Sequence, residues 1–365
     1  MGGRVDLLKQ LRHEIDSGER LGPQLFFTGP YLDGNPASFQ PSIVVQNATE
    51  AQNAVRQLKS EGVDFIKVQS RLQPQAYFAI AQEAQKDDIR FVGHVPDSVT
   101  AAQASEAGQA SIEHLTGVLL GCSTKEEELR QRRLKALPRG ENFSQSLERD
   151  RVWNRDLLAS YSAGKADRLF RKFAANHTWQ IPTLPLLIDL AYLTAESDRP
   201  NDPRMKYIPT DLRHNWELGR REGLSDQTEA DFLIRRKLIQ SSLAAVKEMR
   251  QLGVKLMTGT DSTAPNVFPG FGLHEDLFYM VQARLTPTQA LQAATSNPAE
   301  FLGRSAEQGT ITPGKRADLV LLDANPLDDI RSTEKIHAVI LNGKVLDRGE
   351  LDALLLKAEH FAAAH

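Results

Sequence analysis

The alternation of strand-like and helix-like segments constrains the fold of this chain more than any other feature. Apolar runs bounded by glycine or proline recur at intervals of ~20–30 residues, as in "PQLFFTGPYLDG", "VDFIKVQ", "IRFVGHVPDS" and "ASIEHLTG". Helical patterns separate them, such as "NATEAQNAVRQLKSEG", with Thr49 near its start and Gly62 at its end. This order predicts right-handed βαβ units and therefore a parallel sheet.

The regular spacing breaks at about residue 122. Residues 122–178 and 189–250 are rich in charged residues, and we expect them to form helical insertions between strands. Strand patterns resume at 177–188 and 254–263, and the helical segment "TPTQALQAATSNPAEFLG" follows. The strand patterns number about six, whereas a complete (β/α)8 barrel has eight. The sequence therefore predicts an α/β fold, a TIM-like (β/α)8 barrel that is incomplete.

The end of the chain changes character. "ADLVLLD" and "IHAVILNGKVLDRG" are rich in β-forming residues, and Asn342-Gly343 within the second is a hairpin signal. We therefore divide the chain into a barrel over residues 1–304, a small β element over 305–350 and a helical tail over 351–365.

Composition and charge exclude several classes of protein. The formal net charge is −3 with basic and acidic residues interspersed, so nothing indicates a nucleic-acid or membrane surface. No run approaches the roughly 18 apolar residues of a membrane span, and the N-terminus has no signal core. We expect a cytoplasmic chain as written, with a lost N-terminal signal peptide left open. Because Cys122 is the single cysteine, a metal must be held by His, Asp, Glu or a modified side chain.

Four polar residues fall at the carboxyl ends of predicted strands. They are Lys67 in "FIKV", His94 in "FVGHVP", His114 in "SIEHLTG" and Asp261 in "MTGTDS". That end of the strands carries the chemistry in barrel enzymes, and imidazole with oxygen ligands suits a divalent metal, zinc by default. Each residue also has a structural explanation: an ammonium that reaches water, a satisfied histidine or a helix N-cap.

These stretches, together with "LTPTQALQAATSNPAEFLG" and "GTITPGKRADLVLLDANPLDDI", resemble the amidohydrolase superfamily. The resemblance is greatest to its imidazolonepropionase-like and Xaa-Pro or Xaa-Arg dipeptidase-like branch, and it covers about residues 20–348 apart from the insertions. It implies a metal-dependent hydrolase that cleaves amide C–N bonds of dipeptides or similar small molecules. It also implies that residues 305–350 belong to a composite β-sandwich.

The resemblance implies a role for each of the four residues. Lys67 is carboxylated by CO₂, and the resulting carbamate bridges two metal ions. His94 and His114 bind one metal, while Asp261 binds the other and shuttles protons. A desolvated lysine fits this chemistry, because its neutral amine is nucleophilic.

Three further residues are weaker candidates. Tyr31 in "GPYLDG" lies on a predicted strand-end loop and could touch substrate, although loop tips mostly do not. His274 in "FPGFGLHEDL" lies beyond Asp261, and its alternative is a surface position at a helix start. Glu113 precedes His114 and faces the opposite way on a regular strand, as a structural acid or a support for a ligand.

One motif of the family is missing. The family needs a His-x-His pair at the end of the first barrel strand, and no two of the nine histidines are separated by one residue. The metal that uses this pair and Asp261 loses two ligands, whereas Lys67, His94 and His114 remain. We therefore expect one or two divalent ions per chain, at most one of them well held, and hydrolysis that is weak or absent.

Three functional hypotheses follow. The first is the amidohydrolase, with a small-molecule or dipeptide substrate. The second is a catalytically silent, truncated fragment whose role is binding or assembly. The third is an unrelated barrel enzyme with Lys67 as a Schiff-base amine, which leaves His94, His114 and Asp261 unexplained. Because an incomplete barrel exposes strand edges, a homo-oligomer is expected as well.

Overall fold

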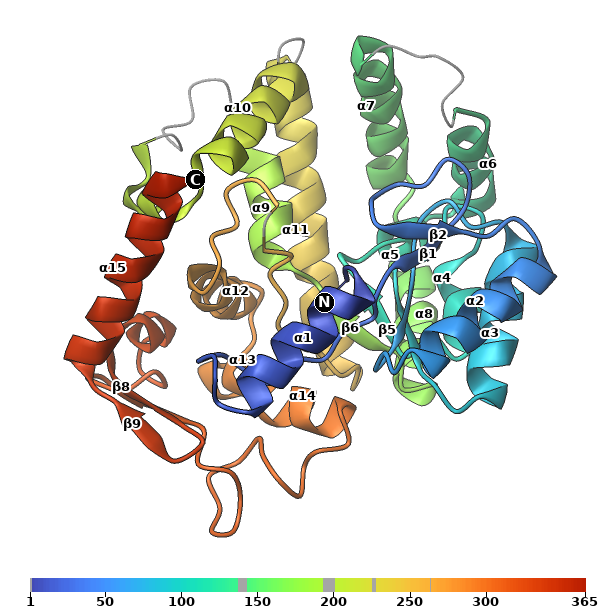
Figure 1. Ribbon diagram of the computed structural model, residues 1–365. Coiled ribbons are helices and arrows are strands. Elements are labelled where there is room, and N and C mark those ends of the chain that lie inside the picture. The colour runs from blue at the N-terminus through green and yellow to red at the C-terminus, as the bar shows by residue number, and fades with distance from the viewer. Residues whose placement is uncertain (1, 137–142, 193–200, 225–227, 263) are drawn as a thin grey trace. The chain divides into compact units, whose positions relative to one another are not determined.

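The computed structural model describes residues 2–136, 143–192, 201–224, 228–262 and 264–365 (Figure 1). The chain forms two compact units, each described by itself. Unit 1 comprises Met1–Arg139, Ala159–Ile181 and Gln251–Lys255; unit 2 comprises Gly140–Leu158, Pro182–Arg250 and Leu256–His365. Among the described helices, none combines the length and apolar character that crossing a membrane requires.

Unit 1 is built on a six-stranded parallel sheet with the strand order β2-β1-β3-β4-β5-β6. The strands are short: β1 (Tyr31–Asp33), β2 (Ser42–Val44), β3 (Ile66–Val68), β4 (Phe91–Gly93), β5 (Ser111–Glu113) and β6 (Trp179–Ile181). In the register of the three central strands, Lys67 lies opposite Val92, and Val92 lies opposite Ser111. This sheet and its covering helices confirm the predicted partial (β/α)8 barrel.

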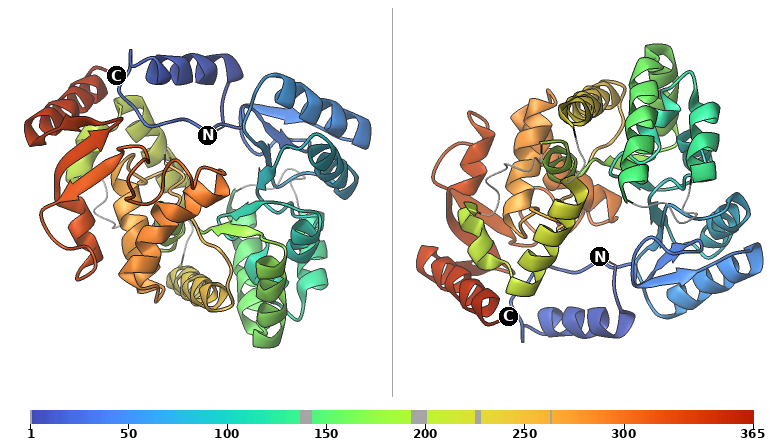
Figure 2. Two further views of the ribbon diagram at one scale, coloured as in Figure 1. Left: turned by 90° about the horizontal axis from the view of Figure 1, so that it is seen from below. Right: turned by 90° about the horizontal axis from the view of Figure 1, so that it is seen from above.

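Helices connect the strands of unit 1. They are α1 (Val5–Asp16), α2 (Ala48–Ser60), α3 (Pro74–Lys86), α4 (Ala101–Glu106), α5 (Val118–Gly121), α6 (Glu126–Ala136) and α8 (Ala163–Ala175). Asn47 caps α2, and Thr100 forms a capping box with Gln103 at the start of α4. Helices α2 and α3 lie side by side against the sheet, and their apolar faces, including Leu58 and Ile80, are fully buried (Figures 1 and 2).

Unit 2 is mainly helical. Its helices are α7 (Phe143–Ala159), α9 (Leu184–Tyr192), α10 (Thr210–Leu224), α11 (Glu229–Gln251), α12 (Phe271–Gln282), α13 (Pro287–Ala294), α14 (Ser296–Phe301) and α15 (Arg348–Ala364), with 3₁₀ turns η2 (Pro203–Tyr207) and η3 (Ile330–Glu334). An antiparallel sheet contains β7 (Leu319–Leu322), β8 (Ile336–Leu341) and β9 (Lys344–Leu346). The β8–β9 turn has positive φ at Asn342 and Gly343, as the hairpin signal predicted.

Two predicted strands differ from the structure. The pattern at 177–188 yields only β6, because Thr183 adopts a φ of +50° and helix α9 begins at the next residue. Within the predicted strand 254–263, the described residues 254–262 form no regular strand, and residue 263 lies outside the described residues. The amides of Thr258 and Gly259 donate instead to the Ala293 carbonyl and the Asp276 carboxylate, so they are not free to pair with a strand. Strand β2 was not predicted and supplies the sixth strand.

Candidate metal centre

Lys67 lies in the middle of β3 and its ammonium reaches a carboxylate rather than open water. Its side chain is 16% exposed, and Nζ lies 2.6 Å from Oε2 of Glu113, which is 13% exposed. The charge inside this apolar strand is therefore neutralised by an ion pair with the end of β5. The ion pair matters for stability, because a buried lysine or glutamate charge without a partner would cost several kcal/mol.

Glu113 and His114 reach the same place although they are consecutive. Alternation along β5 predicts opposite faces, and this expectation for Glu113 is wrong. His114 has a φ of +56° and Leu115 a φ of +54°, so the chain leaves the strand after Glu113. As a result His114 Nε2 lies 3.7 Å from Glu113 Oε2. Left-handed backbone at two non-glycine residues is costly and is typical of functional sites.

His94 directly follows β4 and lies close to Glu113 and His114. Its ring meets that of His114 edge to face, with centroids 5.0 Å apart. The Ser70 hydroxyl lies 2.8 Å from Nδ1 of His94, which leaves Nε2 as the ring nitrogen for a ligand role. Gly93, which precedes it, has a φ of +117°, and a Cβ there would overlap the Val68 carbonyl oxygen. Glycine at this position therefore lets the chain turn the histidine inward.

The charges of the group favour metal binding. Burial, followed by the charge of the His114 side chain, lowers the pKa of His94 to about 3, so its imidazole is neutral at neutral pH. Burial alone would raise the pKa of Glu113, but the nearby charges of Lys67 and His114 outweigh it and the pKa is lowered. A neutral imidazole and an ionised carboxylate are the forms that coordinate a metal.

The residues present fit a divalent ion. Ligand atoms of His94, Glu113 and His114 all lie within 4.8 Å of one another, and among the described residues no second group of three shares this property. Ligand atoms on four-coordinate zinc lie about 3.3 Å apart, since each bond is about 2.1 Å long. The three side chains therefore lie near one another without being at the spacing of a bound ion.

Tyr31 borders this group from β1, within the sheet and not on a loop. Lys67 Nζ lies 5.3 Å from the centre of its ring. Gly2 also lies close to this ring, so that any Cβ at residue 2 would overlap it. The phenol ring thus forms one wall beside Lys67, and contact with substrate stays a proposal.

Asp261 and His274 belong to unit 2. Asp261 is exposed, has a φ of +57° and lies in a turn that the Ala264 amide closes onto its carbonyl. It caps no helix, because the next one, α12, begins at Phe271. His274 lies in the first turn of α12, where Nδ1 is 3.0 Å from the Thr333 hydroxyl and burial lowers its pKa. Their participation with Lys67, His94 and His114 in one site stays a proposal.

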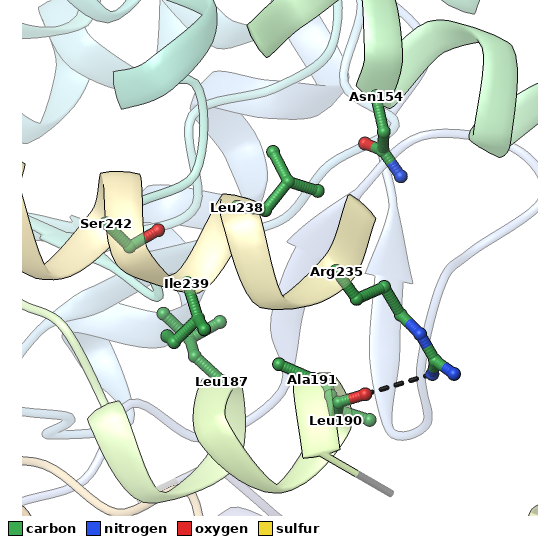
Figure 3. A pocket seen from close by; sticks show the side chains of 8 residues that line it. All are labelled: Asn154, Leu187, Leu190, Ala191, Arg235, Leu238, Ile239 and Ser242. Carbon is green, nitrogen blue, oxygen red and sulfur yellow. Dashed lines mark hydrogen bonds between the residues drawn. The ribbon is translucent and has the colours of Figure 1, made fainter. Parts of the chain in front are cut away.

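A separate pocket in unit 2 contains little polar chemistry (Figure 3). Its volume is about 240 Å³, and four of its eight lining residues are leucine or isoleucine side chains from α9 and α11. Arg235 lies at its edge and donates from Nη1 to the Leu190 carbonyl at 3.0 Å. The side chains around it are Asn154, Leu187, Leu190, Ala191, Arg235, Leu238, Ile239 and Ser242. This pocket has no counterpart of the His–Glu–His group.

Comparisons of sequence identify related proteins. The profile described as "Amidohydrolase family" matches residues 203–346. A 5-methylthioadenosine/S-adenosylhomocysteine deaminase of Moorella thermoacetica is 34% identical over 136 residues, which is 32% of this chain and 32% of its own length. An imidazolonepropionase of Streptococcus pyogenes is 31% identical over 121 residues, 31% of this chain and 28% of its own. The matched stretch thus spans about a third of the curated relatives.

Comparisons of structure agree on the fold. A bottromycin amidohydrolase aligns with a TM-score of 0.75 and 21% identity over 97% of this chain and 71% of its own. A Xaa-Pro dipeptidase, solved with bound methionine in the active site, aligns with a TM-score of 0.60 and 18% identity over 93% and 72%. At sequence identities of 21% and 18%, the two comparisons show a similar fold and nothing further.

Proposed function

We propose that the chain is a member of the amidohydrolase superfamily and acts as a metal-dependent hydrolase of amide bonds in dipeptides or similar small amides. The observation that carries the proposal is that Lys67, in the middle of the short strand β3, lies close to Glu113 at the end of β5 and to the histidines His94 and His114 that follow β4 and β5. In a parallel barrel these strand ends carry the chemistry.

The proposed ligands are His94, His114 and Lys67 as its carbamate, with zinc as the metal. When bound, the ion polarises the scissile carbonyl and makes hydroxide available at neutral pH. Forming the carbamate joins Nζ of the neutral amine to the carbon of CO₂ and releases one proton. Ser70 holds the His94 ring in orientation through Nδ1.

Asp261 is the proposed acid–base group. In this role its carboxylate accepts a proton from the attacking water and delivers it to the leaving amine, so that one residue serves both halves of the reaction. Tyr31 and His274 are the proposed substrate contacts. The aromatic wall beside Lys67 supports this role for Tyr31, whereas the Thr333 contact gives His274 a structural function as well.

The alternative is a catalytically impaired or silent chain. It is favoured by the histidine spacing, since none of the nine histidines forms a His-x-His pair. In this alternative the group at β3–β5 binds one metal weakly or not at all, and the chain serves in binding or assembly, including as a homo-oligomer.

The experiment that tests the proposal is elemental analysis of protein purified without chelators, followed by a panel of dipeptides, small cyclic amides and a nucleoside amine. About one zinc per chain with turnover of an amide supports the hydrolase. Lys67→Ala should weaken zinc binding in bicarbonate-equilibrated buffer, whereas the exposed Lys125→Ala should not. Folded protein with no metal and no turnover would favour the silent chain.

A further inference from the structure

The position of Glu113 is the feature that the family pattern does not explain. Its carboxylate lies near both histidines and Lys67. The strand register puts Glu113 on the face of Lys67, and the left-handed turn directly after it brings His114 to the same place. A residue needed only to neutralise Lys67 would not have to lie 3.7 Å from His114 Nε2. Glu113 therefore has the position of a ligand as well as of a counter-ion.

A carboxylate has two oxygen atoms, so Glu113 can pair with Lys67 and also bind a metal ion. Oε2 lies 2.6 Å from Lys67 Nζ in the ion pair, and a carboxylate as a whole offers about four lone-pair sites. His94 is held through Nδ1 by Ser70, which directs its remaining ring nitrogen toward the group. Two imidazoles and one carboxylate form a recognised ligand set for Zn²⁺ and for Fe²⁺, with a position left open for water.

We propose that Glu113 is a direct metal ligand, which with His94 and His114 forms a His₂Glu centre for one divalent ion. The inference rests on the proposed metal-dependent function and adds to it. Because Glu113 is part of the chain, the centre forms whether or not Lys67 carries CO₂. When Lys67 is carboxylated, a bound ion would offset the repulsion between the carbamate and the Glu113 carboxylate. When it is not, the ion and the ammonium would share the carboxylate.

The distinguishing measurement is Zn²⁺ affinity in CO₂-depleted buffer. Metal-free full-length chain is titrated with Zn²⁺ against a chromophoric chelator, and Co²⁺ absorption reports the coordination geometry. We expect wild type to bind one ion and Glu113→Gln to bind about a hundredfold more weakly. Glu106→Gln, an exposed carboxylate on α4, is the matched control and should bind as wild type does.

Glu113→Gln leaves Lys67 without its carboxylate partner at 2.6 Å, so loss of folding must be separated from loss of a ligand. The double variant Lys67→Met/Glu113→Gln removes both charges, and Lys67→Met alone keeps the carboxylate. We expect Lys67→Met to retain zinc in CO₂-depleted buffer and the double variant to lose it. Equal affinity of these two folded variants would overturn the role of Glu113.

The outcomes separate this inference from the proposed function. If wild type binds no Zn²⁺ with or without bicarbonate, the metal-dependent function fails and Glu113 has no ion to bind. If wild type binds one Zn²⁺ and folded Glu113→Gln binds it within about twofold, only the Glu113 assignment fails. A Co²⁺ spectrum that is unchanged in Glu113→Gln would lead to the same conclusion.

Discussion

The buried carboxyl group of Asp276 allows a test of how ionisation changes the stability of the segment that precedes Asp261. Its carboxylate is fully buried in α12. Oδ1 accepts from the Leu184 amide at 3.0 Å and Oδ2 accepts from the Gly259 amide at 3.0 Å. Burial raises the pKa of Asp276 to about 7, although both hydrogen bonds act to lower it. One carboxyl group thus links the start of α9 to the turn that carries Asp261.

The sign of its pH dependence follows from this pKa. The unfolded chain loses the proton near pH 3.8, whereas the folded chain keeps it up to about pH 7. Between these values the native state binds more protons, so stability falls as pH rises. The slope is about 1.4 kcal/mol per pH unit, and the whole window amounts to about 4 kcal/mol.

Asp276→Asn removes the ionisation and keeps one acceptor oxygen. At pH 5 we expect the variant to be less stable by about 1–3 kcal/mol, because its amide nitrogen faces one of the two backbone N–H groups. By pH 8 wild type has lost stability through ionisation of the buried carboxyl. The difference in free energy of unfolding should therefore shift by about 3 kcal/mol in favour of the variant.

Urea denaturation of metal-free protein at pH 5, 6, 7 and 8, followed by fluorescence of the three tryptophans, measures this difference. Asp328→Asn removes an exposed carboxyl from the same unit and is the matched control. A gap between wild type and Asp276→Asn that stays constant across the four pH values would show that burial does not shift this group. The reasoning would then be refuted.

Two further substitutions test the backbone before His94 and the hydrogen bond that orients its ring. Gly93→Ala should destabilise the chain by about 3 kcal/mol or more in chemical denaturation, because φ is +117° and the new Cβ overlaps the Val68 carbonyl oxygen; an unchanged midpoint would contradict this geometry. Ser70→Ala should weaken Zn²⁺ binding about tenfold without changing the unfolding midpoint, since it removes the contact that orients His94. Unaltered affinity in that chelator competition would mean that His94 needs no such support.

Much of the local structure could be predicted from the sequence. The apolar runs predicted β3, β4 and β5, and the helical pattern with Thr49 near its start and Gly62 at its end predicted α2. The Asn342-Gly343 hairpin and the antiparallel tail were also predicted. These features depend on residues close together in the chain, whose preferences act before any tertiary contact forms. The division at residues 304 and 350, and the composite β-sandwich, stay predictions.

Features that depend on distant partners could not be predicted. The sequence of 254–263 has the composition of a strand, but the amides of Thr258 and Gly259 donate to Ala293 and Asp276. Strand β2 gave no clear pattern, and it forms because β1 offers an open edge for parallel pairing. In both cases the backbone hydrogen-bond partner decides the secondary structure.

The sequence by itself determined that a lysine lies in an apolar strand and that histidines follow two neighbouring strands. Only the tertiary structure decided what neutralises Lys67 and which carboxylate joins the histidines. The register puts Glu113, two residues beyond Ser111, on the same face of the sheet as Lys67, and the left-handed turn at His114 brings that histidine to the same place. Residues 67 and 113 are far apart in the chain, and the parallel register of β3, β4 and β5 is the physical reason that they meet.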